Sequence, residues 1–273
     1  MNKELYPQIF RRKSFHIFRE LEYEPLTKQD LDDILNAYKS FDSLNGIKTE
    51  IKIVKGEQTS CHRNEEYCIM MFSEIKDGYL QNIGYLGEQL DLYLVSKNIG
   101  SLWFGIAKSD EVYNGLNYVI MIAIKKATVF RKDMFKSKRK LLEDIWTGEQ
   151  LDIANIVRFS PSACNSQPWY VENIDNNLYV YRKSKSGKVG IMPKNASLYY
   201  NQIDIGIFMC ILEICLLDKG YQFDRTLYKD EQSFDEKQLN AVYKINNLDW
   251  DCFYNSCSIF SNSLIAKSLL RSS

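Results

Sequence analysis

The alternation of apolar and polar residues predicts helices and strands along most of the chain. Thr27 followed by Asp30 is typical of a helix N-cap, and apolar residues at helical spacing come directly after it. Alternating or β-branched apolar runs predict strands at residues 49–54, 67–72 and 118–124. A longer apolar segment predicts a helix over residues 83–98, with Gly100 as its C-cap.

The second part of the chain shows a similar series. Apolar periodicity predicts helices at residues 141–157 and 196–219, the latter closed by Gly220, and strands at residues 177–181 and 221–228. Two apolar helices that each end at a glycine favour an internal duplication. Residues after about 230 are more polar, and we expect fraying there. The most apolar stretch is interrupted by Glu213 and is too short to span a membrane, so it predicts a buried helix.

Composition excludes several classes of protein. The 273 residues carry 35 Lys and Arg against 35 Asp and Glu, and 45% are hydrophobic, which excludes a disordered chain and a surface built entirely for nucleic acid. There are two histidines and seven cysteines, with no Cys-x-x-Cys pair, so we expect no metal site. The N-terminus has no signal-peptide pattern, so we expect reduced thiols and a cytoplasmic protein.

Four segments combine residue types that bind ligands, and each has an ordinary structural alternative. Residues 160–169 form a stiff loop of hydroxyl and amide side chains between two prolines, or a plain turn. Residues 11–14 suit a phosphate, or form a solvated basic face. Residues 131–140 hold six basic side chains. This composition is typical of a segment that binds nucleic acid, of a phosphate subsite, or of a solvated connection. In residues 100–105 two glycines flank aromatic side chains. This pattern is typical of a loop whose backbone approaches a ligand closely, or of a helix C-cap followed by core aromatics. Cys164 lies in the loop at residues 160–169, but the residues around it match no sequence signature of enzymes that use a nucleophilic cysteine.

These segments together resemble the FMN-dependent nitroreductase family. Residues 161–169 read Pro-Ser-Ala-Cys-Asn-Ser-Gln-Pro-Trp and look like that family's Pro-Ser-x-x-Asn-x-Gln-Pro-Trp loop. Residues 12–16 look like its N-terminal Arg-x-Ser-x-Arg/Lys motif, with His16 at the last cation. Residues 84–105 resemble its glycine loop, and residues 136–138 resemble its Lys-Ser-Arg segment. The resemblance covers residues 8 to 228.

The order of the motifs departs from the family. Arg12 and Pro161 are 149 residues apart, whereas in the family about one helix separates them, and residues 39–43 do not match the loop. The order resembles nitroreductases in which one chain fuses two family-type halves. The fold implied is α+β and three-layered, rich in antiparallel strands, with an internal pseudo-dimer. We expect half one at residues 1–130, half two at 131–230 and a C-terminal extension at 231–273.

The resemblance implies an oxidoreductase that binds FMN, takes hydride from NAD(P)H and passes electrons to a nitroaromatic or quinone-like acceptor by a ping-pong mechanism. It implies one FMN site across the halves and one degenerate pseudo-site, in a monomer that mimics a dimer, although a homodimer is possible. No nucleic acid or membrane partner is implied, and no catalytic residue is assigned. The alternative is a flavin-binding protein without reductase turnover. The cofactor residues implied are Arg12, Lys13, Ser14, His16, Trp103, Phe104, Gly105, Lys136, Lys138, Pro161, Ser162, Ala163 and Asn165.

Overall fold

The computed structural model describes residues 3–18, 24–183, 194–230 and 237–246. The first part of the chain forms α1 (Tyr6–Arg11), α2 (Lys28–Lys39), β1 (Thr49–Lys55), β2 (Tyr67–Ser73), α3 (Tyr79–Ser96), β3 (Ile99–Phe104), β4 (Val112–Tyr113) and β5 (Leu116–Lys126). The second part forms β6 (Trp146–Gly148), α4 (Ala154–Val157), β7 (Trp169–Ile174), β8 (Asn177–Arg182), α5 (Lys194–Asp218), β9 (Gln222–Leu227) and β10 (Gln238–Asn246). Short 3-10 helices lie at Lys3–Leu5, Gly56–Gln58, Met134–Lys136, Leu142–Asp144 and Ala163–Asn165.

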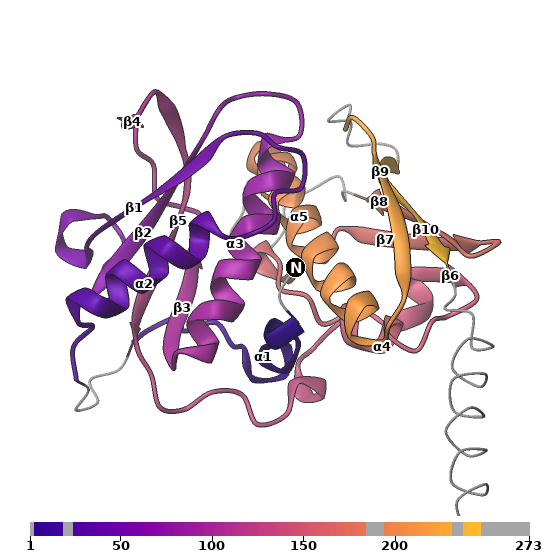
Figure 1. Cartoon of the computed structure of the whole chain (residues 1–273), viewed down its shortest axis with the longest axis horizontal. Helices are drawn as coiled ribbons and strands as arrows, with labels where there is room; N and C mark the ends of the chain where they lie inside the picture. The colour runs from indigo at the N-terminus through magenta and orange to yellow at the C-terminus, as the bar shows by residue number, and fades with distance from the viewer. Residues whose placement is uncertain (1–2, 19–23, 184–193, 231–236, 247–273) are drawn as a thin grey trace, which may run out of the picture.

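Two sheets enclose a central pair of helices, so the fold is α+β with three layers. Helices α3 and α5 pack side by side, with β1, β2, β3 and β5 on one side and β6 to β10 on the other (Figure 1). One apolar core lies between the helices and the first sheet, and a second lies between the helices and the second sheet. A third apolar cluster covers the opposite face of the first sheet. These layers confirm the fold class implied by the sequence.

The two sheets share one strand order. The first runs β1-β2-β5-β3, with β4 beside β5, and the second runs β6-β7-β8-β10-β9. If β4 and β6 are left aside, each part of the chain consists of a hairpin, a long helix and two further strands. The first part follows the succession β1, β2, α3, β3, β5, and the second follows β7, β8, α5, β9, β10, with the same order of strands in the sheet. All pairings between described strands are antiparallel except that of β6 with β7. The match extends the resemblance between the two parts of the chain to their topology.

Helices α3 and α5 cross where each carries a glycine. A Cβ on Gly84 would lie 2.0 Å from the carbonyl oxygen of Ile203, and a Cβ on Gly206 would lie 1.9 Å from that of Gln81. In each helix the carbonyl belongs to the residue three positions before the glycine. The contact is therefore reciprocal, as an approximate two-fold axis between the helices requires, and only glycine allows the two backbones to come so close.

Several sequence predictions agree closely with the structure. Thr27 caps α2 in a capping box with Asp30, and the strands expected at 49–54, 67–72, 118–124, 177–181 and 221–228 match β1, β2, β5, β8 and β9. The buried helix expected at 196–219 is α5, and Gly220 follows it with φ of 81°. By length and composition residues 196–218 are sufficient to cross a membrane, contrary to the expectation that this segment is too short, but 89% of an 18-residue stretch within it is buried in the fold.

Three predictions about elements were wrong. Gly100 is not a C-cap: α3 ends at Ser96, and Gly100 lies within β3 against the ring of Phe15. The helix expected at 141–157 is instead a 3-10 turn, β6 and the four-residue α4, because Gly148 takes a positive φ and residues 146–148 pair with β7. The polar tail expected after residue 230 includes β10, which lies between β8 and β9 in the second sheet, and the rest of that tail, residues 231–236 and 247–273, lies outside the described residues.

Candidate functional site

A buried carboxylate, Asp91 on α3, gathers the N-terminal motif and strand β3. Its Oδ2 accepts hydrogen bonds from Nε of Arg12 at 2.8 Å and from Nε1 of Trp103 at 3.0 Å, and its Oδ1 accepts one from the hydroxyl of Ser101. Ser14 lies beside Ser101 in a parallel β-bridge. Three residues expected at the flavin, Arg12, Ser14 and Trp103, are therefore held around one side chain of the central helix.

The charge balance around Asp91 depends on a second carboxyl group. Burial raises the pKa of Glu88 well above its ordinary value, although the nearby Arg12 opposes this. Its two oxygens have no hydrogen-bond partner among the described residues. Burial tends to lower the pKa of Arg12, but Asp91 and Glu88 raise it, and the guanidinium keeps its charge. Arg12 is 7% exposed, so it is a buried cation fixed by α3.

The loop between α4 and β7 is held rigidly by another buried carboxylate, Asp204 on α5. Its Oδ1 accepts a hydrogen bond from the backbone N–H of Ala163 at 2.9 Å, and its Oδ2 accepts one from the hydroxyl of Ser166 at 3.1 Å. The loop also closes on itself, because Gln167 N–H donates to Oγ of Ser162 at 3.0 Å. Three of its residues have left-handed backbone conformations, Cys164, Asn165 and Gln167. The stiffness predicted for this loop from its prolines thus has a second source in α5.

Asp204 has no cation to balance its charge among its described hydrogen-bond partners. Burial raises its pKa from 3.8 to about 7, and the two hydrogen bonds from Ala163 and Ser166 only partly oppose this. The carboxyl group therefore changes charge near neutral pH, directly behind the loop.

The basic segments and the loop meet at one place. The backbone N–H of Arg131 donates to the carbonyl of Arg11 at 2.9 Å, which joins the two basic segments. Arg139 donates from Nη1 to Oδ1 of Asn165 at 2.9 Å, and Nδ2 of Asn165 donates to the carbonyl of Lys138 at 3.2 Å. Residues far apart in the sequence, at positions 11, 131, 139 and 165, are thereby brought together.

The arginine side chains at this junction form a cluster of cations. Burial and then the charges of Arg131, Arg12 and Arg158 lower the pKa of Arg139 to about 10. Burial and Arg12 also lower the pKa of Arg131. The Nε of Arg139 is buried and has no hydrogen-bond partner among the described residues. Like charges crowded around an unpaired donor indicate a place for an anion, and a phosphate dianion suits guanidinium groups.

Tyr200 on α5 links the two parts of this region. Its hydroxyl donates to the carbonyl of Gly105 at the end of β3, and a Cβ on Gly105 would lie 2.8 Å from the ring. Burial and then the nearby Cys164 raise the pKa of Tyr200, so the ring also lies close to the loop. The end of β3 and the loop of the second half therefore face the same helix.

Some residues predicted for the site lie apart from it or on its edge. Phe104 packs in the third apolar cluster, because alternate residues of β3 face opposite sides of the sheet and Trp103 faces Asp91. Lys13 lies over the ring of Phe15 at 4.5 Å, and His16 is exposed. The side chain of Phe104 therefore points away from those of the other candidates, while its backbone stays in β3 between Trp103 and Gly105. Two further candidates, Lys136 and Lys138, have exposed side chains next to Arg139.

Sequence reasoning missed four residues of the site, namely Asp91, Asp204, Arg139 and Tyr200. The two carboxylates carried a signal, because each is an acid inside an otherwise apolar helical segment that the fold buries. Arg139 lies within the basic segment that was singled out, one residue beyond the part assigned to phosphate. Nothing in the sequence pattern distinguished Tyr200 from other helical aromatics.

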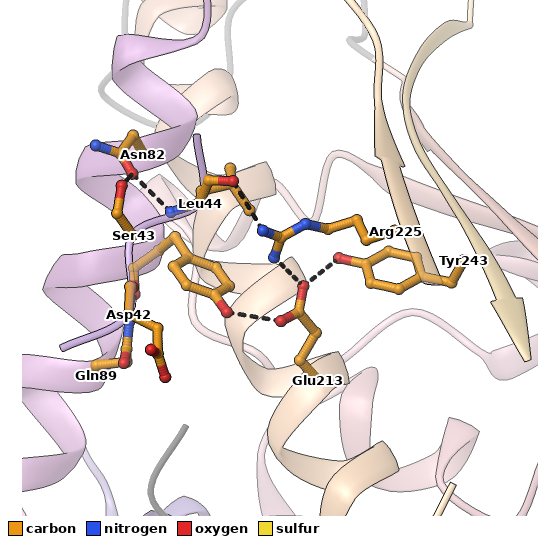
Figure 2. Close-up of polar contacts among 9 residues, drawn as sticks. Asp42, Ser43, Leu44, Asn82, Gln89, Glu213, Arg225 and Tyr243 are labelled. Atoms are coloured by element: carbon orange, nitrogen blue, oxygen red, sulfur yellow. Dashed lines mark hydrogen bonds and ion pairs between the residues drawn. The ribbon is translucent and has the colours of Figure 1, made fainter. Parts of the chain in front are cut away.

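A related arrangement occurs across the approximate two-fold axis (Figure 2). Asn82 lies two residues before Gly84, as Asp204 lies two residues before Gly206. Its Oδ1 accepts hydrogen bonds from the backbone N–H of Leu44 at 2.9 Å and from the hydroxyl of Ser43 at 3.0 Å. The segment after α2 is thus held on α3 as the loop after α4 is held on α5.

In this second region the buried acid is bonded to other side chains of the chain. Glu213, which lies seven residues after Gly206 as Asp91 lies seven after Gly84, accepts hydrogen bonds from Tyr85 at 2.6 Å, Tyr243 at 2.8 Å and Arg225 at 2.6 Å. Arg225 also donates to the carbonyl of Leu44 at 2.7 Å (Figure 2). The cation here is paired with a buried carboxylate, and no anion is needed to balance it.

A cavity of about 210 Å³ lies elsewhere, at the start of α3. It is lined by Lys76, Tyr79, Gln81, Gln202 and Lys229 among others, and by none of the residues predicted for the flavin. The cavity therefore does not coincide with the residues predicted for the flavin.

Comparisons with known proteins concern the family and the fold of the chain. The model of the family described as "Putative TM nitroreductase" matches residues 4–215. A "putative nitroreductase" from Thermotoga maritima has 17% identity and a TM-score of 0.57, with 90% of this chain and 95% of that chain covered. A "putative NADH dehydrogenase/NAD(P)H nitroreductase" from Parabacteroides distasonis has 12% identity and a TM-score of 0.43, with 55% of this chain and 100% of that chain covered.

A "putative nitroreductase in complex with FMN" from Desulfovibrio desulfuricans has 16% identity and a TM-score of 0.40, with 55% of this chain and 99% of that chain covered. No curated protein matches the sequence. The Thermotoga structure shows the shared fold over most of both chains. Because the family model spans more than three quarters of the sequence, the chain belongs to the nitroreductase family described as "Putative TM nitroreductase".

Proposed function

We propose that the protein is an FMN-dependent oxidoreductase that oxidises NAD(P)H and reduces a small nitroaromatic or quinone-like acceptor. Membership of a nitroreductase family supports the reaction class. The observation that carries the cofactor assignment is the buried, unpartnered Nε of Arg139, within a cluster of arginines next to the rigid loop. A phosphate at this position would remove the repulsion among the cations.

The residues of this region fit the parts of FMN. Arg139 and Arg131 would hold the phosphate, with Lys136 and Lys138 at its exposed side and Ser14 as a neutral donor. The rigid loop of Pro161, Ser162, Ala163 and Asn165 would lie along the isoalloxazine, because Asp204 fixes its backbone. Trp103 and Gly105 would border the ring from half one.

The chain's own part in the reaction is to bind, orient and set charge. When bound, FMN supplies the hydride and electron chemistry that connects NAD(P)H with the acceptor. In balance, NAD(P)H, one proton and the acceptor give NAD(P)⁺ and the two-electron-reduced acceptor. Arg131 and Arg139 keep positive charge at the site, which stabilises negative charge on a bound flavin, whereas Arg12 is already paired with Asp91. Because Asp204 has a pKa of about 7, the charge behind the loop depends on pH over the working range.

We further infer one such site per chain, in a cytoplasmic monomer that needs no nucleic acid or membrane partner. The shared strand order and the reciprocal glycine contact support two fused halves that imitate a dimer. The region around Glu213 takes the place of the second site, where Arg225 is already paired.

The visible spectrum of the purified full-length protein tests this proposal. We expect a yellow protein, or one that takes up added FMN, whose flavin absorbance bleaches when NADH or NADPH is added without oxygen and returns with a quinone. Steady-state rates should give parallel double-reciprocal plots, as a ping-pong mechanism requires. Bound flavin that neither nucleotide bleaches would support a flavoprotein without reductase turnover, and a chain that binds no FMN would overturn the cofactor assignment.

A further inference from the structure

The connection between β1 and β2 brings two cysteines and a glutamate together, far from the flavin region in the sequence. Cys61 and Cys68 are buried, at 4% and 0% exposure, and Glu65 is half-buried. The two sulfur atoms and one carboxylate oxygen all lie within 4.8 Å of one another. The sequence predicted no metal site here because six residues separate the cysteines, which is not a familiar zinc spacing.

The loop that makes this group possible is folded tightly. His62 and Asn64 have positive φ values of 50° and 62°, so the chain reverses between Cys61 and Glu65. The backbone N–H groups of His62 and Arg63 donate to the two carboxylate oxygens of Glu65, at 3.1 and 2.6 Å. The carboxylate is therefore held in place by the backbone.

The two thiols are fixed by their surroundings as well. Cys68 lies in β2, paired with β1 and β5 on either side, so its sulfur is held by the first sheet. Thr59 joins the two cysteines: its Oγ1 lies 3.4 Å from the sulfur of Cys68 and accepts a hydrogen bond from the backbone N–H of Cys61 at 3.2 Å. The group thus has ordered neighbours around both sulfur atoms.

We propose that Cys61, Cys68 and Glu65 bind a zinc ion, with water as the fourth ligand. In a tetrahedral site, Zn–S distances of about 2.3 Å place two sulfurs about 3.8 Å apart, and a sulfur and a carboxylate oxygen about 3.5 Å apart. Separations of at most 4.8 Å need to close by about 1 Å. Two thiolates and one carboxylate suit zinc, whereas magnesium and calcium prefer oxygen ligands.

The position of the group indicates what the metal would do. The carbonyl of Arg63 accepts a hydrogen bond from Phe18 N–H at 2.8 Å. Phe18 stacks on Phe15 at 5.6 Å between ring centroids, and Phe15 N–H donates to the carbonyl of Ser101 at 3.0 Å. An ion that fixes the loop at residues 61–65 would therefore support the N-terminal segment that carries Arg12 and Ser14.

Cobalt binding to the full-length protein, purified under reducing conditions and stripped with a chelator, tests the proposal. We expect one Co²⁺ per chain with a thiolate-to-cobalt charge-transfer band, and displacement by one Zn²⁺. The variant Cys61→Ser should lose at least about 100-fold in Zn²⁺ affinity, measured by competition with a chromophoric chelator. Glu65→Gln should bind about 10-fold more weakly and keep the band, because both thiolates remain. The matched control is Cys215→Ala, a buried cysteine outside the group, which should bind like the wild type.

Circular dichroism establishes that each variant is folded, and the wild-type titration alone already decides the question. Substoichiometric cobalt without a charge-transfer band would overturn the proposal. The same holds for unchanged Zn²⁺ affinity in Cys61→Ser. A disulfide between Cys61 and Cys68 in the reduced preparation would also overturn it, and would identify a thiol pair in place of a metal site. None of these readouts depends on bound flavin, so failure here leaves the proposed function intact.

Discussion

At the scale of single residues, three buried acids on the central helices hold the loops of the molecule in place. Asp91 binds the N-terminal motif, Asp204 binds the rigid loop after α4, and Glu213 binds side chains from the second sheet. The three acids differ in whether an arginine is paired with them. Asp91 and Glu213 are paired with arginines, at 2.8 and 2.6 Å, whereas Asp204 is held only by neutral donors among the described residues. Burial raises the pKa of Asp204 to about 7, and only the neutral donors Ala163 and Ser166 oppose this rise.

Replacing Asp204 with asparagine should change how stability depends on pH. The folded pKa of about 7 lies above the ordinary value of 3.8, so the native state binds the proton more tightly than the unfolded chain. In the wild type, this group's contribution to the free energy of unfolding is therefore greatest below about pH 4, falls as pH rises toward 7 and is constant above. Asp204→Asn should remove a fall on the order of 4 kcal/mol, since the rise is about 3 pKa units and each unit corresponds to about 1.4 kcal/mol.

Urea unfolding of both proteins between pH 4 and pH 8 measures this difference. Asparagine keeps an oxygen for the N–H of Ala163, so the loop contact survives the change. The exposed Asp32→Asn on α2 is the control and should follow the wild type at every pH. A wild type and an Asp204→Asn variant with the same pH profile would show that the carboxyl group is not perturbed.

Replacing Arg139 with methionine should weaken FMN far more than riboflavin. The variant removes the unpaired Nε from the arginine cluster, and riboflavin lacks the phosphate. We expect FMN affinity to fall about 10- to 100-fold, equivalent to about 1.4–2.8 kcal/mol, with riboflavin affinity nearly unchanged. Fluorescence titration with both flavins measures the ratio. Lys132→Met, an exposed cation of the same segment, should change neither affinity; equal losses for both flavins in Arg139→Met would place the phosphate elsewhere.

At the scale of elements, the crossing of α3 and α5 determines where the two halves meet. Their backbones touch at Gly84 and Gly206, on the two helices that carry Asp91 and Asp204. Any side chain at either glycine would have to push the helices apart, since the obstacle is a backbone carbonyl.

Gly206→Ala tests the importance of this crossing. Alanine favours a helix over glycine by about 1 kcal/mol, but its Cβ would lie 1.9 Å from the carbonyl oxygen of Gln81. We expect the steric effect to dominate and the free energy of unfolding to fall by about 1–3 kcal/mol or more. Chemical denaturation provides the measurement, with the exposed Asn36→Ala on α2 expected within about 0.5 kcal/mol of the wild type. A stabilised Gly206→Ala would contradict the close contact.

The sequence predicted those elements whose pattern is local. The capping box at Thr27, the alternation in β1 and the long apolar run of α5 identify themselves without reference to the rest of the chain. It did not predict β6 or β10. Three residues of β6 become a strand only by pairing with β7, and β10 is a strand because β8 and β9 flank it.

The candidate site follows the same rule. The rigid loop and the arginines of the N-terminal motif were visible as motifs, because their residue types are contiguous. Asp91, Asp204 and the trio of Cys61, Glu65 and Cys68 take their roles from tertiary contacts, which no local spacing reveals. The segment at residues 100–104, expected to be a loop, is a strand, so the side chains of Trp103 and Phe104 point to opposite faces of the sheet.

At the scale of the whole molecule, two similar halves differ in what they do with corresponding positions. One region has crowded cations with an unpaired donor, and its counterpart has Arg225 paired with Glu213 and donating to the carbonyl of Leu44. The first arrangement leaves the Nε of Arg139 without a partner among the described residues, whereas in the second the arginine is paired with a carboxylate. A single chain built in this way is expected to hold flavin on one side only.

The amount of FMN bound per chain tests this account most directly. Saturated, gel-filtered protein is analysed by native mass spectrometry and by the absorbance of released flavin against the 32.0 kDa chain. The account predicts one FMN per chain in a monomer. Two FMN per chain would show that the region around Glu213 opens for flavin, and no FMN would show that the arginine cluster serves another anion.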